Sequence, residues 1–251
     1  MDKKKKGIIA VLILVIIVCA VGIVSYFVKQ NKAKDENKKI QKIAKEETEE
    51  KMDDEVSIDF EALQQQNADI YAWIRIPETQ IDYPILQHPS DDAYYLNHTV
   101  EGTEGLPGSI YTEKVNSKDF TDFNTVIYGH NMKNGTMFKD LHKYEEEAFF
   151  KENPYVYIYL PDKTLKYHIV AAVTFDDRYI PYSYDFSKKK ECQKFLDDVQ
   201  NGVIKNTKAV YAEEQEITTD DKIITMSTCI ANQNERRWIV VAKLEEDSTQ
   251  K

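Results

Sequence analysis

The feature that most constrains this chain is an apolar segment near its N-terminus. Residues 7–28 form a run of 22 residues without a charged side chain, and most of them are Ile, Val or Leu. At about 1.5 Å per helical residue, this length crosses the roughly 30 Å hydrocarbon core of a bilayer. A surface helix of a soluble protein would carry a polar face, and this run carries none. The segment therefore predicts a single transmembrane helix.

The charges beside this segment predict its orientation. Four lysines, Lys3 to Lys6, precede it, so the positive-inside rule places residues 1–6 in the cytoplasm and the chain after Lys29 outside the cell. A cleaved signal peptide is the alternative. We favour the anchor because the run exceeds the roughly 7–15 residues of a signal-peptide core and no clear small-residue cleavage site follows it.

Composition divides the rest of the chain into a linker and a folded domain. Residues 29–56 are rich in Lys, Glu, Asp and Gln and lack aromatic side chains, which predicts a solvated, partly helical stalk. Folding is expected to begin near Ser57, so that residues 57–251 form one extracellular domain. The whole chain carries a net charge of −10; the first 30 residues carry +4, which leaves −14 for residues 31–251. Such a charge disfavours binding to nucleic acid.

The domain contains short runs of β-branched and aromatic residues separated by Gly, Pro, Asn and Asp, which is typical of a predominantly antiparallel β domain. The runs are residues 81–87, 109–112, 125–129, 156–160, 165–175, 222–228 and 237–244. A helix is predicted over residues 59–74, with Ser57 or Asp59 as its N-cap. Further helical segments are predicted at residues 135–153 and at Ser187 to Asn201.

The three cysteines differ in their predicted surroundings. Cys19 lies within the apolar segment. Cys192 shares helical spacing with three apolar residues and is expected on the buried stripe of the helix over residues 187–201. The stripe consists of Cys192, Phe195, Leu196 and Val199. Cys229 is then a lone thiol at a strand end, although an extracellular protein could instead pair it with Cys192.

Reactive side chains gather at predicted strand ends. Cys229 ends one strand and Arg237 begins the next, eight positions later across the polar ANQNE loop, as in a hairpin. His130 follows another strand in a turn rich in Gly and Asn, where side chains are exposed. Neighbouring imidazolium and guanidinium groups favour the thiolate, which is the nucleophilic form of cysteine, so this trio predicts a nucleophilic site. The other histidines are interpreted as structural: His88, His98, His142 and His168.

Three segments in this order, after the N-terminal anchor, resemble the class B sortases, the cysteine transpeptidases of Gram-positive cell surfaces: TVIYGHNM, TMSTC and RRWIVVAKL. The family pattern T-L-x-T-C is present as TMSTC, with Met226 for the usual Leu, a volume-conserving change. The resemblance implies an eight-stranded β-barrel with N-terminal helices and a long helix before the cysteine strand. It also implies Cys229 as nucleophile, His130 as general acid and base, and Arg237, rather than the adjacent Arg236, as the essential arginine.

The resemblance further implies a groove for a C-terminal sorting signal. Its expected lining residues are Leu96, Tyr128, Tyr179, Ile180, Ser227 and Thr228. The implied reaction cleaves a signal of the Asn-Pro-x-Thr-Asn/Gly kind after Thr, through a thioacyl enzyme, and transfers the secreted protein to an amine of the cell wall. No metal or other cofactor is expected, since no Cys/His cluster has zinc spacing. The alternatives are a non-catalytic surface-binding module and a secreted cysteine peptidase that uses water.

Overall fold

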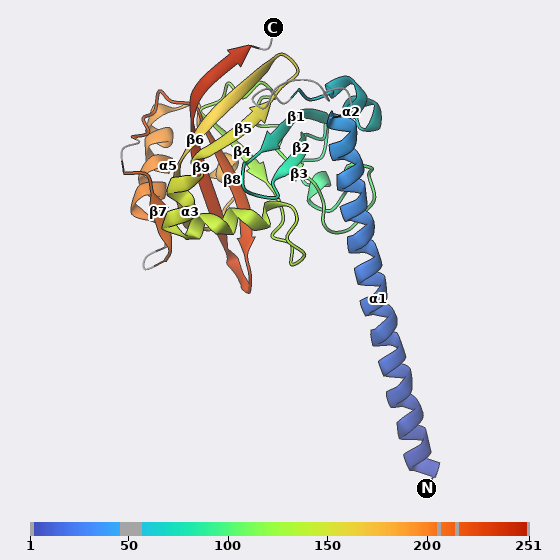
Figure 1. Ribbon diagram of the computed structural model, residues 1–251. Coiled ribbons are helices and arrows are strands. Elements are labelled where there is room, and N and C mark those ends of the chain that lie inside the picture. The colour runs from blue at the N-terminus through green and yellow to red at the C-terminus, as the bar shows by residue number, and fades with distance from the viewer. Residues whose placement is uncertain (1–2, 46–56, 205–206, 214–215, 250–251) are drawn as a thin grey trace.

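The computed structural model describes residues 3–45, 57–204, 207–213 and 216–249, and within these residues one sheet contains nine strands. The strands are β1 (Ile70–Arg75), β2 (Asp82–Leu86), β3 (Ile110–Tyr111), β4 (Asn124–Tyr128), β5 (Tyr155–Tyr159), β6 (Lys163–Asp176), β7 (Ala209–Tyr211), β8 (Ile223–Ile230) and β9 (Gln233–Thr249). Their order is β5-β1-β2-β3-β4-β8-β9-β6-β7, and β5 also pairs with β6. This additional pairing closes eight strands into a barrel (Figure 1), so the predicted eight-stranded barrel is confirmed.

The ninth strand, β7, extends the sheet outside the closed ring. The long strand β6 pairs along one edge with β5, at residues 164–168, and then with β7, at residues 171–173. The sequence analysis missed β7 because a strand of three residues is too short to show a pattern.

The helices lie outside the barrel, with α1 and α2 on one side and α3 and α5 on the other (Figure 1). They are α1 (Lys3–Lys45), α2 (Phe60–Gln66), α3 (Glu147–Glu152), α4 (Ile180–Ser183) and α5 (Lys189–Asn201), with 3₁₀ helices η1 (Tyr94–Leu96) and η2 (Phe138–Glu145). The expected insertion at residues 135–153 is therefore two short elements, η2 and α3. In α5 the predicted buried stripe is confirmed, because all four of its members are buried.

The helix predicted over residues 59–74 is wrong in its second half. Asp59, and not Ser57, caps α2 by accepting a hydrogen bond from the Ala62 amide at 2.8 Å, but the helix ends at Gln66. Residues 70–75 instead form β1, between β2 and β5. Five of its six residues are buried, so the run lacks the alternation that separates a strand from a helix.

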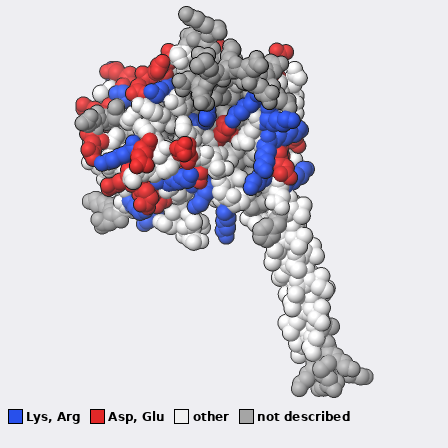
Figure 2. Space-filling model, in the orientation of Figure 1, with Lys and Arg blue, Asp and Glu red and all other residues white. Residues whose placement is uncertain are grey.

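The helix α1 runs without interruption from the apolar segment into the charged one. Its apolar part is long enough to cross a membrane and projects from the domain without charged side chains (Figure 2). Its later part does not match the solvated stalk expected from composition, because Ala33, Ile40 and Ala44 are buried. These residues share one helix face, and Ile40 packs with Leu63 of α2. Residues 46–56 lie outside the described part of the chain.

Side chains along β9 alternate between two apolar clusters. Trp238 and Val240 pack in the cluster enclosed by the barrel, whereas Ile239 packs on the outer face with Phe195 of α5. This alternation places the residues of β9 alternately on the two faces of the barrel wall, which determines which side chains can reach a groove on its outer surface.

Candidate active site

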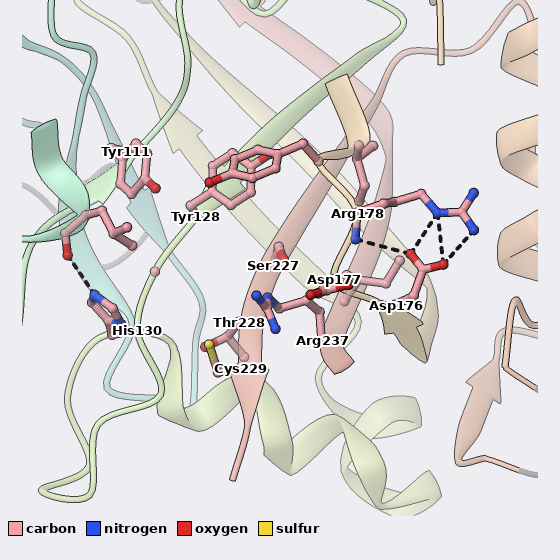
Figure 3. Close-up of a pocket in the computed structure, with 15 residues that line it drawn as sticks. Tyr111, Tyr128, His130, Asp176, Asp177, Arg178, Ser227, Thr228, Cys229 and Arg237 are labelled. Atoms are coloured by element: carbon pink, nitrogen blue, oxygen red, sulfur yellow. Dashed lines mark hydrogen bonds and ion pairs between the residues drawn. The ribbon is translucent and has the colours of Figure 1, made fainter. Parts of the chain in front are cut away.

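An open groove crosses the ends of β4, β8 and β9 (Figure 3). It encloses about 770 Å³, including the part open to solvent. All nine residues singled out from the sequence line it: Leu96, Tyr128, His130, Tyr179, Ile180, Ser227, Thr228, Cys229 and Arg237. Residues separated by up to 141 positions in the chain therefore meet at one site, which is the arrangement that joint action on one ligand requires.

Strand register explains why the Cys, His and Arg side chains converge. The strands β4 and β8 are parallel, and Tyr128 pairs with Ser227. His130 and Cys229 each follow that pair by two residues, so they leave equivalent ends of neighbouring strands. The antiparallel strand β9 then places Arg237 directly opposite Cys229. Neighbouring strands lie only about 4.8 Å apart, so this register brings the three residues into one small region.

His130 is held by its loop and by the opposite wall of the groove. The Phe138 amide donates to the His130 carbonyl at 2.9 Å, and the imidazole Nε2 lies 2.7 Å from the Leu96 carbonyl oxygen. A carbonyl can only accept, so Nε2 carries a proton and donates it. The preceding residue, Gly129, lies in a tight space in which a Cβ atom would come within 2.5 Å of Ile110 Cδ1.

Arg237 is oriented by its own hairpin. Its Nη1 donates to the carbonyls of Asn234 at 2.8 Å and Arg236 at 3.0 Å. In contrast, Nη1 of Arg236 donates to the Gln233 side chain, and Arg236 is not among the residues that line the groove. Of the two adjacent arginines, only Arg237 is therefore placed to contact a ligand in the groove.

Cys229 carries an exposed, free thiol, which a ligand in the groove can reach. Cys192 is also free, is buried in α5, and has its Sγ 3.3 Å from the Phe186 carbonyl oxygen. The alternative disulfide between these two cysteines is therefore absent. Cys192 is not among the residues that line the groove.

The walls combine apolar surface with unused polar groups. Leu96 and Tyr179 are 42% and 59% exposed, whereas Ile180 is buried. Tyr128 stacks on Tyr111 with ring centroids 5.4 Å apart, and its buried hydroxyl has no hydrogen-bond partner among the described residues. Burial raises the pKa of Tyr128 beyond its usual range, so this hydroxyl stays protonated and can donate to a ligand.

Six residues of the lining were missed by the sequence analysis: Tyr111, Gly129, Asp176, Asp177, Arg178 and Ile239. Arg178 Nε donates to both carboxylate oxygens of Asp176, at 2.7 and 2.9 Å, and its Nη1 donates to Tyr184. Figure 3 shows its head group directed away from Cys229. Hydrogen bonding to Asp176 raises the pKa of Arg178, so this pair is a permanent ion pair at the rim. The only sequence signal was its position beside Tyr179.

Comparisons with known proteins all find members of one family. The family model described as "Sortase domain" matches residues 74–245. The chain is 34% identical to sortase B of Listeria monocytogenes over 195 residues, which are 76% of this chain and 75% of that protein. A crystal structure of sortase B from Bacillus anthracis superposes on this chain with a TM-score of 0.73 at 31% identity. The superposition covers 89% of this chain and 100% of the B. anthracis chain. A sortase B–substrate complex from Staphylococcus aureus gives a TM-score of 0.72 at 25% identity, covering 87% and 99% of the two chains.

Proposed function

The chain belongs to the sortase family, in class B, and from this membership we propose how its groove performs the transpeptidation. The family implies a cysteine transpeptidase, and Cys229 is the candidate nucleophile. The observation that carries the assignment is the register of β4, β8 and β9, which brings the exposed Cys229 thiol, His130 and Arg237 together.

In the proposed first step, the Cys229 thiolate attacks the Thr carbonyl carbon of a sorting signal. The S–C bond forms, and the tetrahedral intermediate collapses as the C–N bond to the next residue breaks. Protonated His130 gives its proton to the leaving amine. In the second step, an amine attacks the thioacyl carbon, His130 takes the amine proton, and the thiolate is released.

Arg237 is proposed to stabilise the oxyanion or to orient a substrate carbonyl. Its guanidinium is always charged, and a positive group aimed at developing negative charge lowers the barrier. The hairpin carbonyls hold it through Nη1, and no hydrogen bond from its other nitrogens is found within the described residues. Those nitrogens are therefore available to a substrate.

The substrate that we propose is a C-terminal signal of the Asn-Pro-x-Thr-Asn/Gly kind on a secreted protein. Leu96 and Ile180 offer apolar contact, and the Tyr128 hydroxyl offers an unused donor to a peptide carbonyl. A solved structure of S. aureus sortase B is a complex with substrate, which supports binding of a substrate by this chain as well. The acceptor is proposed to be an amine of a peptidoglycan precursor or cross-bridge.

We also propose that α1 anchors the enzyme, with residues 1–6 in the cytoplasm and the catalytic domain on the cell surface. The apolar part of α1 supports a membrane span by length and composition. Residues 7–28 would form the span, residues 29–56 the connection, and residues 57–251 the catalytic domain.

The test is mass spectrometry of the full-length protein in detergent, incubated with an Asn-Pro-Gln-Thr-Asn peptide with and without a glycine-based or diaminopimelate-type amine. Cys229→Ala removes the proposed nucleophile, and Cys192→Ala is the matched control because that thiol is buried away from the groove. An amine-dependent ligated product that is lost only in Cys229→Ala is expected. Cleavage indifferent to the amine would indicate a peptidase. Absence of processing, together with a thiol inert to alkylation, would favour a binding module.

A further inference from the structure

The main-chain carbonyl of Cys229 lies where the sheet loses a strand. On one side, Cys229 pairs with Arg237 of β9. On the other side, β4 ends at Tyr128 opposite Ser227, and the Gly129 amide makes the next backbone bond, to the Ser227 carbonyl at 3.2 Å. Beyond this point β4 supplies no backbone amide to a carbonyl of β8, so other groups must donate a hydrogen bond to it.

Two side chains replace the missing strand. Asn131 Nδ2 donates to the Cys229 carbonyl oxygen at 2.9 Å, and His142 Nε2 lies 3.1 Å from the same oxygen. The two side-chain nitrogens are themselves 3.0 Å apart. Asn131 follows His130 directly in a loop, and His142 belongs to the 3₁₀ helix η2, so two separate segments meet at this one carbonyl.

His142 is in turn held in place from behind. Its Nδ1 lies 2.6 Å from Glu145 Oε1, and its ring is parallel within 20° to that of Trp238, at a centroid distance of 6.1 Å. Lys208 donates to the other oxygen of Glu145 at 3.0 Å. Burial opposes ionisation of Glu145, but the hydrogen bonds from His142 and Lys208 outweigh it and hold its pKa below the ordinary value. The ionised Glu145 therefore accepts from Nδ1, which fixes the ring orientation.

The arrangement satisfies the Cys229 carbonyl in both protonation states of His142. When His142 is neutral, Nε2 accepts from one N–H of Asn131, and the other N–H of Asn131 donates to the carbonyl. When His142 is charged, its Nε2–H can donate to the carbonyl directly. The main-chain carbonyl of Cys229 therefore stays hydrogen-bonded in either state, which limits movement of the Cys229 side chain.

We propose that Asn131, His142 and Glu145 are positioning residues that fix Cys229 through its main-chain carbonyl. They touch no reacting atom and act through the placement of the thiol relative to His130 and Arg237. This inference rests on the proposed role of Cys229 as nucleophile. A rate changes about tenfold for each 1.4 kcal/mol of activation free energy. Loss of one such hydrogen bond is therefore expected to slow the reaction about tenfold.

The experiment uses the full-length protein and separates hydrogen bonding by residue 142 from its packing. His142→Phe keeps a ring against Trp238 but can neither accept from Asn131 nor donate to the Cys229 carbonyl, whereas His142→Gln carries an amide that can do both. Glu145→Gln removes the charge behind His142 from a residue that is partly exposed. His168→Phe is the matched control, because His168 of β6 lies edge-on to Tyr155 of β5 and does not line the groove.

Four quantities are measured: kcat and KM for transpeptidation, the rate of Cys229 alkylation by iodoacetamide, and the Tm. We expect His142→Phe to lower kcat and the alkylation rate about tenfold with KM unchanged, and His142→Gln to recover most of the loss. A smaller fall in kcat is expected for Glu145→Gln, and none for His168→Phe. The alkylation rate tests positioning even if the peptide is not processed, so the proposed substrate can fail separately.

The proposal would be overturned if His142→Gln were as slow as His142→Phe, since hydrogen bonding by residue 142 would then be irrelevant. A fall in Tm with unchanged kcat and alkylation would overturn it as well, because His142 would then serve only to pack on Trp238.

Discussion

Gly129 occupies a space that has no room for a methyl group, and we predict that Gly129→Ala damages the site more than the fold. A Cβ atom at this position would lie 2.5 Å from Ile110 Cδ1 and 2.7 Å from two ring atoms of Phe138. Ile110 and Phe138 are both buried and cannot simply move aside. Overpacking of this kind costs about 1–3 kcal/mol.

The strained position, residue 129, lies between the end of β4 and His130. The Gly129 amide donates to the Ser227 carbonyl, so relief of the clash would shift His130 relative to Cys229. For a domain of this size, a loss of about 1–3 kcal/mol corresponds to roughly 2–12 °C in Tm. We expect kcat to fall by more than tenfold, because catalytic geometry tolerates displacements of only about 0.5 Å.

The assay combines thermal unfolding with steady-state kinetics of the full-length protein. Ile110→Val removes the Cδ1 atom that makes the shortest contact, so in a double-mutant cycle it should restore part of the stability lost in Gly129→Ala. Gly22→Ala is the matched control, because nothing lies within 4 Å of a Cβ at that helical position. An unchanged Tm and kcat in Gly129→Ala, or no coupling to Ile110→Val, would refute the reasoning.

Three further predictions follow from single contacts. Arg237→Lys should lower kcat at least tenfold, because an ammonium lacks the planar fork that the hairpin carbonyls hold, whereas Arg236→Lys should stay within about twofold; equal effects of the two substitutions would contradict this. Burial, reinforced by Asp92, raises the pKa of Glu113 to about 7. The folded state therefore binds this proton more tightly than the unfolded state, and stability falls as pH rises from about 4.5 through 7, by at most about 3 kcal/mol. Glu113→Gln should abolish this part of the pH dependence of denaturant unfolding, and an unchanged profile would count against it. Asp59→Ala should cost about 0.5–2 kcal/mol through loss of the α2 cap, measured by chemical denaturation; a loss below about 0.3 kcal/mol would show that the cap contributes little.

Patterns that depend on neighbouring residues were readable from the sequence. The apolar segment in α1, the buried stripe of α5 and most of the barrel strands follow from local periodicity, which records which face of an element is buried. The nucleophilic trio was also readable, because Cys229, His130 and Arg237 each stand beside a strand end. Their roles remain predictions, but the structure brings all three to one groove.

The local sequence pattern did not predict an element whose two faces are both buried, nor a contact between residues far apart in the sequence. The residues of β1 are nearly all buried, so their spacing did not reveal a strand. The docked part of α1 looked solvated because its few apolar residues are diluted by lysines, although they share one face. His142 looked structural, since nothing near it in sequence indicates that it reaches a carbonyl 87 positions away.

The sequence by itself determined a membrane-type helix, a β-rich domain and the chemical identity of the reactive residues, because these depend on composition and short-range spacing. Only the tertiary structure decided which strands pair in parallel and which side chains hold the Cys229 carbonyl. Those outcomes depend on register between segments about 100 residues apart, and such register is set when the whole barrel closes and its core packs.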